Sequence, residues 1–183
     1  SRSSAAIRAT EQWTAREPQR AEAWFYLAGA YGPLTQWRIL RGQRLAAARD
    51  ALKIKNALER AIGPRARMLL LCNPHNPVGR VFTKEELAAL AEICVRRNLV
   101  LCSDEIHCGL ILDRDKHHIP AASLNPEIAA RTVTLMSASK TFNLPALGCA
   151  YAISSNPALR AKLKKAMAGI VHHVGLMGYV ATL

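Results

Sequence analysis

Residues 135–143, LMSASKTFN, place a lysine at the end of an apolar run. Lys140 follows Ser137 and Ser139, and an aromatic ring and an asparagine come shortly after it. A lysine is rarely buried, because its ammonium loses more free energy by desolvation than its stem gains by burial. A lysine at the end of a buried strand therefore either extends its ammonium to solvent or takes part in chemistry as an amine.

Polar side chains also follow two earlier apolar runs of the sequence. The segment CNPHNPVG comes after the first run, and SDEIH comes after the second. These segments supply an amide at Asn76, a carboxylate at Asp104 and an imidazole at His107. Because ligands of parallel sheets gather at the carboxyl ends of the strands, we expect these side chains and Lys140 to face one another in one crevice.

The elements that must position these side chains alternate strands with helices from about residue 65. Apolar runs predict buried strands at 66–72, 99–103, 132–137 and 148–154. Thr83 and Glu86 form a capping box at the start of a helix, and Asn156 followed by Pro157 starts another. Continuous apolar strands separated by helices predict an α/β fold with a mostly parallel sheet flanked by helices on both faces.

The first sixty residues have a different texture. Residues 5–62 are rich in Ala, Arg, Glu and Leu at helical spacing, and all three tryptophans lie before residue 40. The stretch AEAWFYLAGAY resembles the first helix of a tetratricopeptide repeat, with Trp24, Leu27, Ala28 and Tyr31 at the positions of that pattern. We therefore expect a helical, tetratricopeptide-like arm over residues 1–62 and a separate domain over residues 63–183.

The composition limits the class of protein. Half of the 183 residues are hydrophobic, and only 10 Gly and 9 Pro are present, which predicts an ordered chain of one or two domains. The sequence contains no apolar run long enough to span a membrane and no leading segment that resembles a signal peptide, so we expect a soluble, cytoplasmic protein without a membrane partner. Five cysteines without a CxxC pair favour a reducing compartment over a disulfide framework.

The net charge of +12 makes a nucleic-acid partner a hypothesis to test against the distribution of charge. Residues 1–62 carry 11 Lys/Arg and 5 Asp/Glu, and residues 63–183 carry 14 and 8, so each part has a charge of +6. This even distribution, without a basic tail, is typical of solvated helix faces. We expect no nucleic-acid partner.

Two pairs of adjacent histidines are candidate metal ligands, at His117–His118 and His172–His173. Adjacent residues of a strand point to opposite faces, so neither pair is suited to bind one ion. Another candidate cluster consists of Cys102, His107 and Cys108 near Cys72, but buried cysteines usually act as small hydrophobic residues. We expect no metal site.

Three motifs resemble those of fold type I pyridoxal phosphate enzymes. They are NPHNPVGRV at 73–81, SDEIHCGLIL at 103–112 and SASKTFNLPALGCAY at 137–151. In motif order and spacing, residues from about 57 to 183 are similar to the middle of the aminotransferase-like family, in its cystathionine β-lyase branch. The resemblance implies a partial large domain, pyridoxal 5'-phosphate as the cofactor, a sulfur-containing amino acid as the substrate, and a homodimer as in the parent family.

The resemblance also implies a role for each candidate residue. Lys140 would be the catalytic residue that bonds covalently to the cofactor and moves the substrate α-proton, and desolvation at the strand end would make it a competent amine. Asp104 would pair with the pyridine nitrogen of the cofactor. Asn76 would hydrogen-bond its phenolic oxygen, and Ser137 and Ser139 would bind its phosphate.

His107, the remaining cofactor-binding candidate, leaves two reactions open. Many transaminases of the fold have tyrosine at this position, whereas the lyase branch has histidine, so His107 favours a carbon-sulfur β-lyase over an aminotransferase. The family's phosphate loop and its substrate-carboxylate arginine are not identifiable, since neither Arg80 nor Arg114 matches that arginine. We therefore expect an incomplete enzyme with weak or no activity. The alternative is a non-catalytic helical interaction module fused to an inert lyase fragment.

Overall fold

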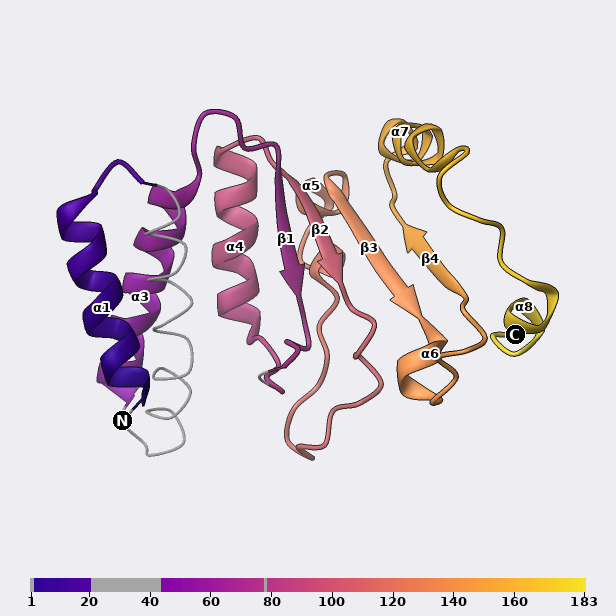
Figure 1. The fold of residues 1–183 in the computed structure, drawn as a ribbon, viewed down its shortest axis with the longest axis horizontal. Helices are drawn as coiled ribbons and strands as arrows, with labels where there is room; N and C mark the ends of the chain where they lie inside the picture. Colours follow the sequence, from indigo (N-terminus) through magenta and orange to yellow (C-terminus); the bar gives the residue numbers. More distant parts are fainter. Residues whose placement is uncertain (1, 21–43, 78) are drawn as a thin grey trace. The chain divides into compact units, whose positions relative to one another are not determined.

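The structure is a computed structural model that describes residues 2–20, 44–77 and 79–183. The chain divides into two compact units, Ser1–Ala66 and Arg67–Leu183. The first unit contains helices α1 (Arg2–Arg16) and α3 (Arg44–Ala61) (Figure 1). The tetratricopeptide pattern residues, at positions 24, 27, 28 and 31, lie outside the described residues.

Helix α3 shows that residues 44–61 are helical, as the helical spacing of residues 5–62 predicts. Within the first unit, Ile7 and Thr14 of α1 and Ala57 of α3 are buried. In the described ranges of the chain, no helix combines the length and the apolar character that crossing a bilayer requires.

The second unit is built on a four-stranded sheet with the strand order β1-β2-β3-β4. Its strands are β1 (Met68–Cys72), β2 (Val100–Asp104), β3 (Thr132–Ser137) and β4 (Ala150–Ile153). Strands β1, β2 and β3 run parallel, with Cys72 opposite Asp104 and Asp104 opposite Leu135. Their arrowheads point the same way (Figure 1), so their carboxyl ends lie side by side and form the carboxyl edge of the sheet. Helix α6 (Ala138–Thr141) also lies there (Figure 1). The predicted α/β fold with a mostly parallel sheet is confirmed.

Strand β4 differs from the other three strands. It pairs antiparallel with β3, with Ser137 opposite Ala150, and it covers the middle of the predicted segment 148–154. All four of its residues are exposed, so the prediction of a buried strand is wrong there. An apolar run does not encode strand direction, and an edge strand has a neighbour on one side only.

Helix α4 (Lys84–Arg96) begins at the predicted capping box. Thr83 Oγ1 accepts from Glu86 N at 3.3 Å, and Glu86 Oε2 accepts from Thr83 N at 2.9 Å. These two bonds satisfy amides that have no partner inside the helix. Leu87, Ala91 and Cys94 then form one buried face of α4, so the helix is amphipathic.

The core lies between the sheet and the helices α4, η1 (Ala121–Ser123) and α5 (Pro126–Ala129). Leu71, Leu101 and Ile128 are buried in it. Thr132 Oγ1 donates to Ile128 O at 2.6 Å, which ties β3 to α5. Apolar burial of this kind is the main source of stability for such a layer.

The other face of β1 is not covered by the described residues. Met68 and Leu70 are 55% and 69% exposed, whereas Leu71, on the opposite face, is buried. At β1 the prediction of a sheet covered on both faces is therefore wrong in this structure. Side chains alternate between the two faces along β1, and only the face that includes Leu71 contributes to the core.

Two helices follow β4. Helix α7 (Pro157–Met167) begins as predicted, with Asn156 Oδ1 accepting from Ala158 N at 2.9 Å and from Leu159 N at 3.3 Å, and with proline as its first residue. Helix α8 (Leu176–Val180) comes last. Gly178 of α8 lies so close to the backbone carbonyl of Leu147 that a Cβ there would be 2.8 Å from the oxygen.

Candidate functional site

Asp104 ends β2 at the carboxyl edge of the sheet, where it is half-buried. Its Oδ1 accepts from Ile106 N at 3.3 Å, and its backbone carbonyl accepts from Asn73 N at 2.9 Å. No other residue in the described part of the chain bonds to the carboxylate. Asp104 therefore offers one carboxylate oxygen to a ligand.

The NPHNP segment follows β1 at the same edge of the sheet. Buried Asn73 anchors it, because its amide N–H donates to Asp104 and its Oδ1 accepts from Phe82 N at 3.0 Å. His75 N donates to Arg80 O at 2.7 Å and closes the turn. Asn76 is exposed at the tip of the segment, and its side-chain amide bonds to no described residue. The side-chain amide of Asn76 is therefore free to bind a ligand, while the hydrogen bonds of Asn73 hold the segment in place.

Ser137 ends β3 and caps α6, the short helix that contains Lys140. Ser137 Oγ donates to Cys149 O at 2.8 Å, accepts from Ser139 N at 3.2 Å, and lies 2.9 Å from Ser139 Oγ. The two serine hydroxyls are therefore close together at the end of the strand. A phosphate group needs such donors beside a backbone N–H.

Lys140 is exposed, and its ammonium bonds to no described residue. The prediction that Lys140 is desolvated is wrong for this structure. The physical reason is that the lysine lies on the helical turn beyond β3, not in the buried part of the strand. Its amine is accessible to a ligand at the carboxyl edge of the sheet.

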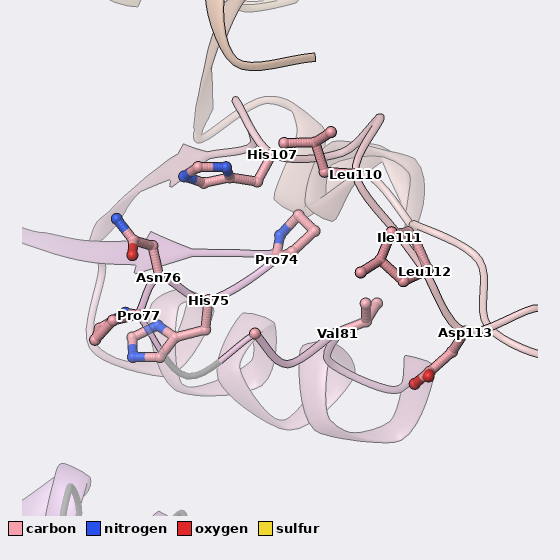
Figure 2. A pocket seen from close by; sticks show the side chains of 11 residues that line it. Pro74, His75, Asn76, Pro77, Val81, His107, Leu110, Ile111, Leu112 and Asp113 are labelled. Carbon is pink, nitrogen blue, oxygen red and sulfur yellow. The ribbon is translucent and has the colours of Figure 1, made fainter. Parts of the chain in front are cut away.

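A pocket of about 320 Å³ lies beside the NPHNP segment, at the lower end of the range for small-molecule sites. Figure 2 shows His107 and Asn76 at one end of it and Leu112 and Asp113 at the other. The structure therefore brings these two predicted residues together. The other four predicted site residues do not line this pocket. His75 does line it, and the sequence did not single it out.

The carboxyl edge of the sheet gathers an amine, a carboxylate, an amide and two hydroxyls. An amine can bond covalently to an aldehyde, a carboxylate can hold a protonated ring nitrogen, and hydroxyls can bind a phosphate. No group of three or more His, Cys, Asp or Glu side chains within the described residues could hold a metal ion. This donor set therefore fits a phosphorylated aldehyde with a ring nitrogen.

Glu105 lies next to the site and was not predicted from the sequence. It is 2% exposed, and its carboxylate contacts Ser103, His118 and the backbone of Ala121. The sequence does contain a signal for it, because an acidic residue two positions after a buried serine lies on the same face of an extended chain. That signal is visible only once Ser103 is known to be buried.

Arg80 is engaged by its own segment. Its guanidinium forms an ion pair with Glu86, the third residue of α4, and lies 4.5 Å from the centre of the Phe82 ring. The side chains of the ion pair are only 16% and 23% exposed. Arg80 thus stabilises the junction between the NPHNP segment and α4, and its charge is already paired.

Two buried thiols of the second unit stay protonated at neutral pH. Burial raises the pKa of the Cys94 thiol to about 11, from an ordinary value of 9.0. Burial also raises the pKa of Cys102, and the Asp104 carboxylate raises it further. Because the thiolate is the reactive form, neither residue is a nucleophile of the site.

Comparisons with known proteins identify the family. The aminotransferase class I and II family model matches residues 45–182. The chain is 47% identical over 88 residues to DapC of Mycobacterium tuberculosis, named a probable N-succinyldiaminopimelate aminotransferase, which covers 48% of this chain and 22% of that protein. It is 39% identical over 104 residues to the cystathionine beta-lyase PatB of Bacillus subtilis, which covers 57% of this chain and 27% of that protein.

Among solved structures, cystalysin from Treponema denticola, which contains a pyridoxal 5'-phosphate cofactor, matches with a TM-score of 0.60 and 38% identity. The match covers 63% of this chain and 29% of cystalysin. The chain thus spans 22% to 29% of the length of these three relatives. The family match begins within α3, before residue 57, and nothing in the comparisons supports the tetratricopeptide-like interpretation of residues 5–62.

Proposed function

The chain belongs to the class I and II aminotransferase family, and we propose that its second unit binds pyridoxal 5'-phosphate and acts on an amino acid. One observation carries the proposal. Lys140 presents an accessible amine with no described partner, three residues after Ser137, at the edge where β1, β2 and β3 end. Aldehyde cofactors need a free amine at such a position.

Each residue of the carboxyl edge binds a different group of the cofactor. Lys140 forms the covalent bond, and Asp104 uses its free carboxylate oxygen to hold the pyridine nitrogen. Asn76 donates its amide to the phenolic oxygen. Ser137 and Ser139 bind the phosphate, for which their mutual hydrogen bond and the bond from Ser137 Oγ to Cys149 O must open.

When bound, pyridoxal phosphate withdraws electrons from the α-carbon of an amino acid, which acidifies the proton on that carbon. Once the amino group of the substrate has taken the place of Lys140 in the covalent bond to the cofactor, the freed Lys140 amine would remove this proton and hold it at Nζ. Asp104 keeps the ring nitrogen charged throughout, because an anion beside the nitrogen favours its protonated form. His107 lies at the pocket end shared with Asn76, where it would form part of the cofactor site.

The substrate class we propose is a sulfur-containing amino acid, and the reaction is β-elimination of its thiol. This part of the proposal is supported by His107 in the SDEIH motif and by the similarity to PatB and cystalysin. The alternative reaction is amino transfer, supported by the similarity to DapC. Pyruvate release from cystathionine distinguishes elimination from transfer, which instead consumes an added 2-oxo acid.

The test of cofactor binding is titration of the purified chain with pyridoxal 5'-phosphate. We expect a visible absorbance band, and we expect sodium borohydride to fix the cofactor to the peptide that contains Lys140, as detected by mass spectrometry. Lys140→Ala should abolish both signals. The matched control is Lys162→Ala in α7, which removes an equally exposed lysine and should change neither. Absence of both signals in the unaltered chain would instead support a non-catalytic interaction module.

A further inference from the structure

Glu105 is the one acidic residue that is buried within the described part of the chain. Its Oε1 accepts from Ser103 Oγ at 2.8 Å and from Ala121 N at 3.0 Å, and its Oε2 lies 2.7 Å from His118 Nε2. A buried carboxylate is tolerated only when donors satisfy it in this way. The three contacts are therefore what holds Glu105 inside the protein.

The partners of Glu105 come from two parts of the chain. Ser103 belongs to β2, whereas His118 and Ala121 lie beyond the loop 106–117. Glu105 thereby fixes both ends of this loop to each other. The loop contains His107 and residues 110–113, which form one wall of the pocket in Figure 2. The position of that wall depends on the Glu105 contacts.

Asp104 and Glu105 point to opposite sides of the sheet. Successive side chains of an extended chain alternate between faces, and the Ser103–Glu105 hydrogen bond places Glu105 on the Ser103 side. Asp104 therefore projects to the other side, where its carboxylate has one long hydrogen bond, to Ile106 N at 3.3 Å. Because so little holds the Asp104 side chain directly, its direction is set by its backbone, which pairs with Cys72 and Leu135 in the sheet and which Glu105 ties to the segment 118–121.

We propose that Glu105 is a positioning residue for the cofactor site. Its buried carboxylate locks the end of β2 to the segment 118–121, which aims Asp104 at the carboxyl edge and holds the His107 wall of the pocket in place. Glu105 itself contacts neither cofactor nor substrate. The identity of the cofactor rests on the proposed function, whereas the locking of the loop does not.

Three substitutions weaken or remove the contacts of the Glu105 carboxylate to different extents. His118→Ala removes one contact and leaves the Ser103 and Ala121 contacts in place. Glu105→Gln keeps an oxygen acceptor for Ser103 and Ala121 and loses the charge. Glu105→Ala removes both carboxylate oxygens and with them all three contacts. The controls are His172→Ala and Glu127→Gln, which alter an exposed histidine and an exposed carboxylate of the same unit.

The first measurement is hydrogen exchange of the loop amides at a temperature where circular dichroism shows each variant to be folded. Cys108 N donates to the backbone carbonyl of Glu105, just before the loop, and Leu110 N donates to that of His107 inside it, so the protection of these two amides reports the order of the loop. We expect their exchange to accelerate at least about tenfold in His118→Ala and further in Glu105→Ala, and to stay unchanged in both controls. Unchanged exchange in folded His118→Ala and Glu105→Gln would overturn the proposal, even if Glu105→Ala does not fold.

The second measurement is the Kd for pyridoxal 5'-phosphate, by absorbance titration. We expect Kd to rise about tenfold in His118→Ala, with a smaller change in Glu105→Gln because its side-chain amide has the shape of the carboxylate and can still contact all three partners. A residue that only stabilises the fold would lower Tm without changing Kd in the folded protein, so an unchanged Kd also overturns the positioning role. If the unaltered chain binds no cofactor, the proposed function fails, and the exchange measurement alone decides whether Glu105 locks the loop.

Discussion

Gly109 lies directly against Thr141. A Cβ built on Gly109 would be 2.5 Å from both Thr141 Cγ2 and Thr141 Oγ1, closer than real Cβ contacts. Gly109 belongs to the turn after His107, and Thr141 follows Lys140 in α6. The missing side chain therefore lets the turn that contains His107 approach α6, which contains Lys140.

Gly109→Ala should push α6 away from this turn. Thr141 is β-branched and cannot easily rotate out of the way, so we expect the free energy of unfolding to fall by about 1 to 3 kcal/mol. The Kd for pyridoxal 5'-phosphate should rise at the same time, since α6 carries Lys140. Chemical denaturation and absorbance titration measure the two effects.

Two further variants make this prediction specific. Gly148→Ala places a methyl group where no atom lies within 4 Å, so it should change neither stability nor Kd by much. The double variant Gly109→Ala, Thr141→Ala should recover most of the loss, because it removes the atoms that clash. If the double variant remains as impaired as Gly109→Ala alone, the contact with Thr141 is not the cause.

The local features of this chain were predictable because neighbouring residues determine them. The Thr83–Glu86 capping box and the Asn156 cap depend on spacings of two to four residues, and both are confirmed. Strands β1, β2 and β3 were predicted from apolar runs and lie within one residue or two of the expected bounds. The carboxyl edge with its polar segments follows from the parallel direction of these strands.

The remaining features depend on contacts between distant residues. The direction of β4 is set by its pairing with β3, which its apolar sequence does not specify. The exposure of Lys140 depends on where the helical turn begins after β3. The contacts of Glu105 with His118 and Ala121 span 13 and 16 residues, and no local pattern predicts them.

Arg80→Ala should destabilise the second unit without weakening cofactor binding. The substitution removes a partly buried ion pair with Glu86 and a cation–π contact with Phe82, together worth about 1 to 2 kcal/mol. Thermal denaturation measures the loss, and Arg114→Ala, at an exposed position, is the control with little expected change. A large rise in the Kd for the cofactor with unchanged stability would contradict the assignment of Arg80 to the junction with α4.

The buried Cys94 thiol should make stability decrease at high pH. Its pKa is about 11 in the folded protein and near the ordinary 9.0 when unfolded, so the unfolded chain releases the proton first as pH rises. The contribution is therefore complete below pH 9 and is lost as pH rises toward 11, by up to about 2 to 3 kcal/mol at about 1.4 kcal/mol per pKa unit.

The measurement is the free energy of unfolding by urea between pH 8 and 11 in the unaltered chain and in Cys94→Ala. Lysines and tyrosines titrate in both proteins, so only the difference between the two pH profiles reports on Cys94. The alanine variant should be less stable at pH 8 and should lose less stability over the range. Parallel profiles would show that Cys94 ionises equally in the folded and unfolded chain.

Asp104→Asn should separate the chemistry of the site from its architecture. The amide oxygen can still accept from Ile106 N, so the turn that follows β2 keeps its one side-chain bond, and stability should change by less than about 1 kcal/mol. The negative charge is lost, however, and a charge-assisted hydrogen bond is worth about 1.5 to 3 kcal/mol, which corresponds to roughly a 10- to 100-fold rise in Kd for pyridoxal 5'-phosphate. Asp115→Asn, at an exposed position, is the matched control.

Because the ring nitrogen needs the Asp104 carboxylate to stay protonated, any cofactor that Asp104→Asn does bind should fail to promote exchange of the substrate α-proton with deuterium. Circular dichroism that shows unfolding of Asp104→Asn would make Asp104 a structural turn residue, and an unchanged Kd in a folded variant would remove it from the site.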